Sequence, residues 1–225
     1  MKQKLTIDAL IKEAQEFCVI QSKFQHTELF GVTDGKAVGT LIEAKFQQHL
    51  NEKFEVVIGN AASGINLPSE DINTDIKVTS IKQPQSSSPF KDAKQKIYGL
   101  GYNLLVFVYD KKDDQSSNTS TLNFVSCSFI SKERTGDYTT TFRLREMVND
   151  KANVADIVSY FTDKNIPADE ITLIKIAEHV LSNPPEQCYL TISNALQWRL
   201  QYQRIVALTD DIPGISKIVS YNKPE

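Results

Sequence analysis

Asp75 and Lys77 lie two residues apart in the segment from Thr74 to Ile81, whose side chains alternate in the manner of a β-strand. Residues two apart on a strand point to the same face, about 6.5 to 7 Å from each other along the backbone. A carboxylate in that position can hold a divalent cation, and a neighbouring ammonium can orient a water molecule or stabilise developing charge. The pair therefore indicates metal-assisted hydrolysis of a phosphodiester, with Ile76 pointing into the core.

The pair also has a plainer interpretation, because a surface strand can carry Asp75 and Lys77 as a simple ion pair. Three neighbouring features favour chemistry: an acidic loop at 64–71, a polar loop at 83–89, and Glu43 on an upstream amphipathic segment. Glu43 lies on the flank of the apolar stripe of that segment, which predicts partial burial. We assign Glu43 a catalytic role beside the metal, against the alternative of a solvated helix residue.

The hydrophobic pattern predicts the elements that must position these residues. Helices are expected at 5–24, 36–51, 90–99, 153–163, 168–182 and 191–206. Strands are expected at 54–58, 74–81, 104–109 and 122–130, with loops at 59–69, 83–89 and 111–120. The order predicts a single domain over 1–225, with a catalytic α/β core at about 1–135 and a mainly helical C-terminal part at about 136–225.

From about residue 39 to residue 109, the expected order is a helix with Glu43, a strand, an acidic loop, the strand with Asp75-Ile76-Lys77, a helix and an apolar strand. This order resembles the PD-(D/E)xK nuclease superfamily. The string Asp-Ile-Lys-Val-Thr-Ser-Ile-Lys-Gln-Pro-Gln-Ser-Ser resembles its type II restriction endonucleases more closely. The resemblance implies a central mixed β-sheet flanked by helices. It also implies Mg²⁺ as cofactor and hydrolysis of double-stranded DNA at a short specific sequence, leaving 5′-phosphates.

The resemblance further implies an acidic metal ligand upstream of Asp75, and two residues compete for that position. Asp71, with Glu70 beside it, is acidic but precedes Asp75 by only four residues, a shorter separation than the family usually shows. Asn66 suits the usual separation better, although its neutral carbonyl is a weaker Mg²⁺ ligand than a carboxylate. We favour Asn66 in the family position, which would mark a weakened or inactivated site, and keep Asp71 as its rival.

Amide, hydroxyl and ammonium side chains follow the Asp75–Lys77 strand and could contact DNA. Glutamine can bond adenine, serine can bond bases or phosphates, and lysine can neutralise phosphates. A solvated turn and a solvated helix face are the plainer alternatives. The predicted DNA contacts are Gln83, Gln85, Ser86, Ser87, Lys91 and Lys94.

On the last expected helix, Trp198 and Tyr202 lie one turn apart, and we expect both to pack in the core. Arg199 and Arg204 are weaker candidates for phosphate contacts.

Composition limits the remaining possibilities. The chain has 225 residues, 40% hydrophobic and 24% charged, as expected for a compact globular protein. It lacks the roughly 18 consecutive apolar residues of a membrane span, and its N-terminal stretch lacks the apolar centre of a signal peptide. The three cysteines lie far apart among apolar neighbours, so we expect reduced thiols and a cytoplasmic protein. A net charge of −3 does not exclude DNA, since an acidic nuclease can present one basic cleft.

The sequence therefore favours a restriction endonuclease, acting as a homodimer because one active centre cuts one strand of a palindrome. A nuclease fold that binds DNA without cutting it is the first alternative, which the neutral Asn66 keeps open. A DNA-repair nuclease that recognises DNA structure is the second, and the amide-rich loop argues against it.

Overall fold

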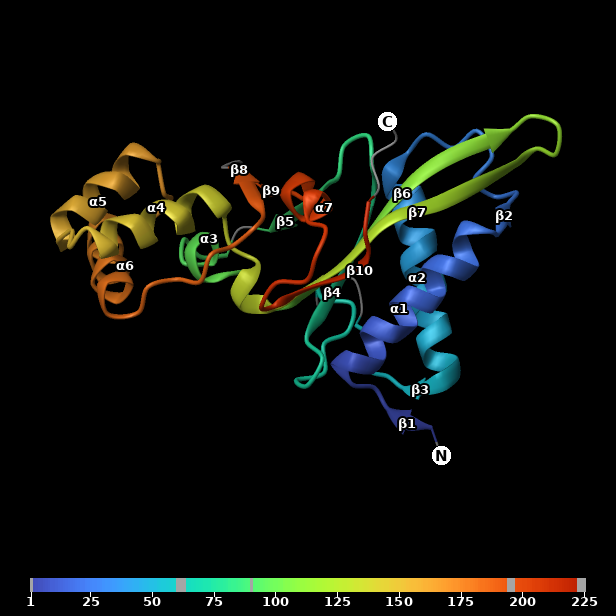
Figure 1. The fold of residues 1–225 in the computed structure, drawn as a ribbon, viewed down its shortest axis with the longest axis horizontal. Helices are drawn as coiled ribbons and strands as arrows, with labels where there is room; N and C mark the ends of the chain where they lie inside the picture. Colours follow the sequence, from blue (N-terminus) through green and yellow to red (C-terminus); the bar gives the residue numbers. More distant parts are fainter. Residues whose placement is uncertain (1, 60–63, 90, 194–196, 222–225) are drawn as a thin grey trace. The chain divides into compact units, whose positions relative to one another are not determined.

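The computed structural model describes residues 2–59, 64–89, 91–193 and 197–221, and the chain forms two compact units (Figure 1). Unit 1 is built from residues 1–86, 102–131 and 205–225, and unit 2 from residues 87–101 and 132–204. The chain therefore leaves unit 1 and returns to it twice.

Unit 1 combines a mixed sheet with two long helices. Its elements are β1 (Gln3–Lys4), α1 (Ile7–Ser22), β2 (Gln25–His26), α2 (Gly35–Lys53), β3 (Phe54–Glu55), β4 (Thr74–Ser80), β6 (Asn103–Asp114), β7 (Thr119–Ile130) and β10 (Ile215–Val219). The sheet has the order β10-β7-β6-β4, and β2 also pairs with β7. Strand β4 is parallel to β6, whereas β6 and β7, and β7 and β10, are antiparallel. The expected α/β class with a central mixed sheet and helices is confirmed.

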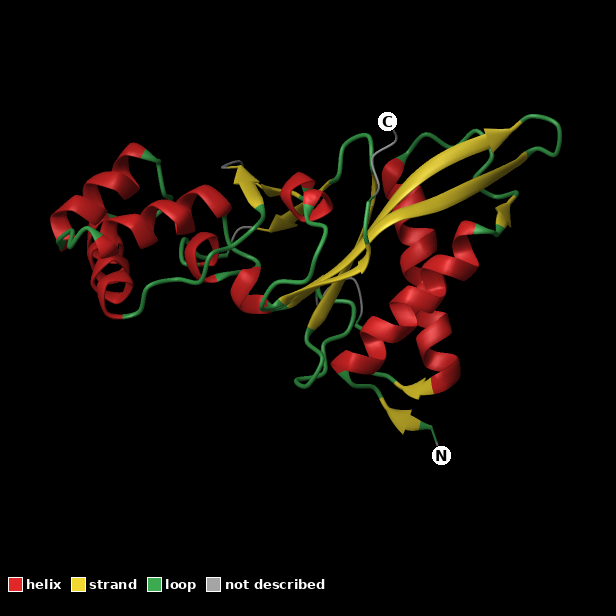
Figure 2. Ribbon diagram, in the orientation of Figure 1, coloured by secondary structure: helices red, strands yellow, loops and turns green. Residues whose placement is uncertain are grey.

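The core of unit 1 lies between this sheet and the two helices (Figure 2). Phe107 on β6 stacks edge-on against Phe46 of α2, with ring centroids 5.1 Å apart, and against Phe17 of α1 at 5.8 Å. All six residues of the apolar run 104–109 are buried, on both faces of β6. The run therefore forms the buried central strand that its composition predicts.

Both helices begin at side-chain caps. The hydroxyl of Thr6 accepts a hydrogen bond from the backbone N–H of Ala9, and the Asp34 carboxylate accepts one from Lys36. The predicted helices at 5–24 and 36–51 are confirmed within two residues at each end. The expected strand at 54–58 shortens to the two residues of β3.

Unit 2 is mainly helical, with a small sheet. Its elements are α3 (Gln95–Tyr98), a 3₁₀ turn (Lys132–Arg134), α4 (Tyr138–Asn149), α5 (Val154–Asp163), α6 (Glu170–Ser182), β8 (Thr191–Ser193) and β9 (Gln197–Gln201). Two elements cross the unit boundaries: β5 (Gln85–Pro89), which pairs with β9 in the sheet β5-β9-β8, and α7 (Gln203–Ala207). Helices α4, α5 and α6 share a core that includes Leu144, Phe161 and Ile176.

The expected helix at 191–206 is wrong, because the chain there forms β8, β9 and the short α7. Trp198 and Leu200 are buried while Arg199 between them is exposed, and burial that alternates from one residue to the next is the pattern of a strand. Helix α4 was not expected, since its threonine and aromatic residues have low helix propensity. Its Asp137 cap and the burial of Leu144 override that propensity.

Three further expectations need correction. The helix expected at 90–99 is only the single turn α3, which ends at Gly99 with φ of +90°. The polar loop at 83–89 contains the strand β5, and the loop at 111–120 consists largely of the ends of β6 and β7. Beside its helices, the part at 136–225 contains β8 and β9, and β10 pairs with β7 in the sheet of unit 1.

All three cysteines are buried and form no disulfide in the described part of the chain, as expected. Among the described residues, no helix is both long enough and apolar enough to cross a membrane.

Candidate active site

A cavity of about 400 Å³ lies in unit 1, where α2 faces β4 and the loop that precedes β4. It contains Glu43, Asp75 and Lys77, which come from two different elements. Its lining residues are Thr40, Glu43, Ala44, Gln47, Gly59, Gly64, Ile65, Asn66, Asp75, Ile76 and Lys77.

Asp75 and Lys77 form a close ion pair on β4. The Lys77 Nζ atom lies 2.7 Å from Asp75 Oδ2, and the Asp75 side chain is only 5% exposed. Burial lowers the pKa of the Lys77 ammonium, but the adjacent Asp75 carboxylate outweighs it, so the pKa is raised and the lysine stays charged. Ile76 between them is fully buried, as its predicted orientation requires.

The Asp75 Oδ2 atom is buried and, among the described residues, receives no hydrogen bond of good geometry. Lys77 balances the charge of this oxygen, but a buried carboxylate oxygen that accepts no well-aligned hydrogen bond still has capacity for a further ligand. It is therefore the atom of the cavity best suited to bind a cation.

Glu43 faces this ion pair from α2. Burial raises the pKa of its carboxyl group to about 7; the Lys77 charge opposes this shift, the Asp75 charge adds to it, and a hydrogen bond with Asn66 opposes it. Near neutral pH, Glu43 can therefore both hold and release a proton. The expected partial burial of Glu43 is confirmed.

Asn66 connects β4 to Glu43. Its Oδ1 atom accepts a hydrogen bond of 2.8 Å from the backbone N–H of Ile76, and its side chain also bonds Glu43. Strand β4 lies at the edge of its sheet, so this amide satisfies a backbone donor that the sheet leaves open. Asn66 therefore lines the cavity with its carbonyl oxygen already engaged.

Asp71 does not line the cavity. It lies on the surface in an ion pair with Lys4, and its neighbour Glu70 is also exposed. The structure thus brings Asn66, and not Asp71, together with Asp75.

Two polar side chains of the cavity were not identified from the sequence. Thr40 and Gln47 lie on the same face of α2 as Glu43, three residues before it and four after it. Helical spacing from Glu43 could have identified them.

The candidate DNA contacts occupy several positions. Gln83 is exposed in the turn after β4, whereas Gln85, Ser86 and Ser87 lie on β5. Lys91 and Lys94 are exposed before α3.

The aromatic residues of the last segment pack as expected, since Trp198 and Tyr202 are buried. Of the two arginines there, Arg199 is exposed on β9, and Arg204 stacks on the Tyr138 ring at 4.1 Å.

The turn after β4 is tied to the cavity strand. Thr79, on the same face of β4 as Asp75 and Lys77, donates its hydroxyl to the Gln85 carbonyl and accepts from the Gln85 N–H, each at 3.1 Å. The start of β5 is therefore fixed to β4.

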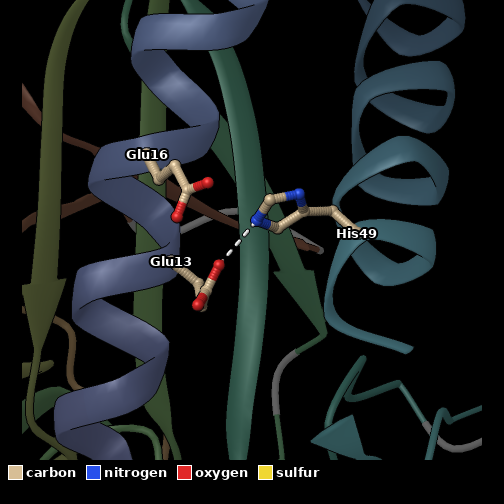
Figure 3. Close-up of side chains that lie close together, drawn as sticks. All are labelled: Glu13, Glu16 and His49. Atoms are coloured by element: carbon tan, nitrogen blue, oxygen red, sulfur yellow. Dashed lines mark hydrogen bonds and ion pairs between the residues drawn. The ribbon is translucent and has the colours of Figure 1, made fainter. Parts of the chain in front are cut away.

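A second polar cluster joins α1 to α2 (Figure 3). Glu13 contacts His49 at 2.8 Å, and Glu16 lies beside them. The Lys53 ammonium pairs with Glu13 at 2.8 Å and with Glu16 at 3.0 Å, so it already supplies the positive charge that a metal would bring. No spacing of residues along the chain indicates this cluster, because helix packing brings its members together.

Comparison with known proteins identifies the chain. The family model of the type II restriction enzyme NspV matches residues 4–217. The chain belongs to this family. The curated type II restriction enzyme NspV from a strain of Nostoc is 49% identical over 218 residues, covering 97% of this chain and 98% of the relative. The prediction of a type II restriction endonuclease, and hence of an enzyme, is confirmed by this membership of the NspV family.

Among solved structures, the tetrameric restriction endonuclease SfiI bound to cognate DNA matches with a TM-score of 0.39 and 12% identity. The match covers 91% of this chain and 84% of that one.

Proposed function

We propose that this member of the NspV family hydrolyses phosphodiester bonds of double-stranded DNA at a short specific sequence, with Mg²⁺ as cofactor. The observation that carries the proposal is the meeting of Glu43, Asp75 and Lys77 in one cavity. Two carboxylates and a lysine are the groups that a PD-(D/E)xK centre requires, which supports placing the chain in that superfamily.

The donor set of the cavity fits a hard divalent cation. Mg²⁺ prefers carboxylate oxygens, and the buried Oδ2 atom of Asp75 forms an ion pair with Lys77 but, within the part of the chain that the structure describes, accepts no well-aligned hydrogen bond. Asp75 and Glu43 would hold the ion, which would polarise the phosphate and lower the pKa of the attacking water. We propose no metal role for Asp71, because its charge is paired with Lys4 at the surface.

Each of the other residues of the site then has its own role. Lys77 stays protonated and can donate hydrogen bonds to the attacking water or to a phosphate oxygen. Glu43, with a pKa of about 7, can release its proton near neutral pH and so become the carboxylate that would hold the ion. Asn66 positions Glu43 against β4, so a neutral residue here is compatible with an active site.

A plasmid cleavage assay with Mg²⁺ tests the proposal. We expect the chain to cut, and we expect Asp75→Asn and Lys77→Ala to abolish cutting. Each variant leaves one member of a buried ion pair without its partner charge and so lowers the melting temperature, and cleavage is therefore measured at a temperature where circular dichroism shows both variants folded. Cutting by either variant at the parent rate would refute the site assignment. Glu16→Gln is the matched control, because its acid lies in the second cluster and should leave cleavage unchanged.

A DNA-binding protein that no longer cuts is the second candidate, and the neutral Asn66 is the observation that favours it. Cleavage by the parent chain would exclude it, whereas cleavage only after Asn66→Asp would establish it. If the target is a palindrome, cutting both strands requires two such centres, so we also propose a homodimer. Analytical ultracentrifugation tests the dimer.

A further inference from the structure

The small sheet of unit 2 has one buried face and one polar face. On β9, Trp198 and Leu200 are buried, whereas Arg199 is exposed and Gln201 is partly exposed. Successive strand residues point to opposite faces, so Arg199 and Gln201 share the polar face.

The neighbouring strand continues this face. Ser193 of β8 lies opposite Arg199, and Thr191 lies opposite Gln201. Ile192 between them is buried, so the two hydroxyl side chains point the same way as the arginine and the glutamine. The face thus presents a guanidinium, an amide and two hydroxyls.

These groups match the edges of DNA bases. Arginine forms paired hydrogen bonds with guanine and glutamine with adenine in the major groove, and serine or threonine can bond either. Residues two apart on a strand are separated by about 6.8 Å, which equals two base-pair steps of about 3.4 Å. Within the described chain, the Arg199 side chain has no hydrogen-bond or ion-pair partner, so its donors are available.

The sheet also has a rigid support. The buried Asp137 carboxylate accepts hydrogen bonds of 2.8 Å from the backbone N–H groups of Ile192 and Thr140. It therefore fixes β8 to the first turn of α4, and a fixed backbone is what base recognition requires.

We propose that the polar face of β8 and β9 reads bases in the major groove of DNA, with Arg199 and Gln201 as specificity-determining residues. A β-sheet face can enter that groove. The inference rests on the proposed function, and it extends the predicted contacts at Gln85 and Ser87, since β5 pairs with β9.

Binding selection tests the inference without any cleavage. The parent chain and its variants would be mixed with a pool of duplexes carrying a randomised segment, in Ca²⁺, and the bound duplexes sequenced. For the parent we expect one enriched sequence. For Arg199→Ala and Gln201→Ala we expect relaxed selection at one or two base pairs each, and affinity for the enriched duplex lower by roughly 5-fold to 150-fold.

Controls separate base reading from other roles. Arg199→Lys keeps the charge but loses the paired donors, so it should relax selection as Arg199→Ala does. Arg143→Ala and Gln15→Ala change exposed residues of the same types on α4 and α1 and should leave selection intact.

Equal weakening for every duplex, with a lower salt dependence, would show that Arg199 contacts phosphate and would overturn the inference. Unchanged selection by both alanine variants would also overturn it. The proposed active site fails separately, if Asp75→Asn still cuts DNA, because selection in Ca²⁺ does not depend on cleavage.

Discussion

Glu43→Gln should make the protein more stable above neutral pH while damaging its activity. In the folded chain, the Glu43 carboxyl has a pKa of about 7, against an ordinary value of 4.5. Between these two values, the folded state holds a proton that the unfolded state has released. The free energy of unfolding therefore falls as pH rises from about 4.5 to about 7, and it levels off above pH 8.

The difference between the two pKa values corresponds to about 3 kcal/mol. Glu43 keeps some contact with solvent, which screens its charge, so we expect about 1 to 3 kcal/mol between pH 5 and pH 8.5. Glutamine is neutral at both pH values and can still bond Asn66. Glu43→Gln should therefore exceed the parent by this amount at pH 8.5 and match it at pH 5.

Urea unfolding without metal at pH 5 and pH 8.5 measures the effect, and a plasmid assay with Mg²⁺ measures the lost activity. Glu52→Gln is the control, because Glu52 lies exposed on the same helix and should show no such gain. If Glu43→Gln were no more stable than the parent at pH 8.5, the inference that burial in this cavity disfavours the ionised form of Glu43 would be refuted.

Three further substitutions follow from the hydrogen bonds. Asn66→Asp replaces a hydrogen-bond donor to Glu43 with a third carboxylate in the cavity, which raises the pKa of Glu43 further. The fall in the free energy of unfolding should therefore extend to higher pH, and cleavage at pH 7 should decrease; a gain in cleavage would contradict this. Thr79→Val should cost about 1 to 2 kcal/mol in urea unfolding by leaving the Gln85 N–H unpaired, and Thr79→Ser should restore most of it. Asp137→Ala should lower the free energy of unfolding by about 3 kcal/mol or more, because it leaves the buried N–H groups of Thr140 and Ile192 unpaired. Asp169→Ala removes the exposed N-cap of α6 and should lower it by only about 1 kcal/mol; urea unfolding measures both.

The local patterns were sufficient for the elements with strong periodicity. The stripes of α1 and α2 and the apolar run at 104–109 carry their own signal, since burial on one face or on both leaves a regular mark in the sequence. The segment at 191–206 failed for the opposite reason. Its strands are only three and five residues long, and so short an alternation cannot be distinguished from a helical pattern without its partners.

The amino-acid sequence was enough to place Asp75 and Lys77 on one face of a strand, because two residues on one strand need no other element to share a face. It was also enough to indicate the restriction-enzyme family. The residues that face this pair became known only from the packing of the elements. It brought Glu43 across from α2, raised its pKa by burial, and put Asn66 rather than Asp71 at the cavity. Burial and long-range contact depend on how elements pack, and neither is encoded in the spacing of residues along the chain.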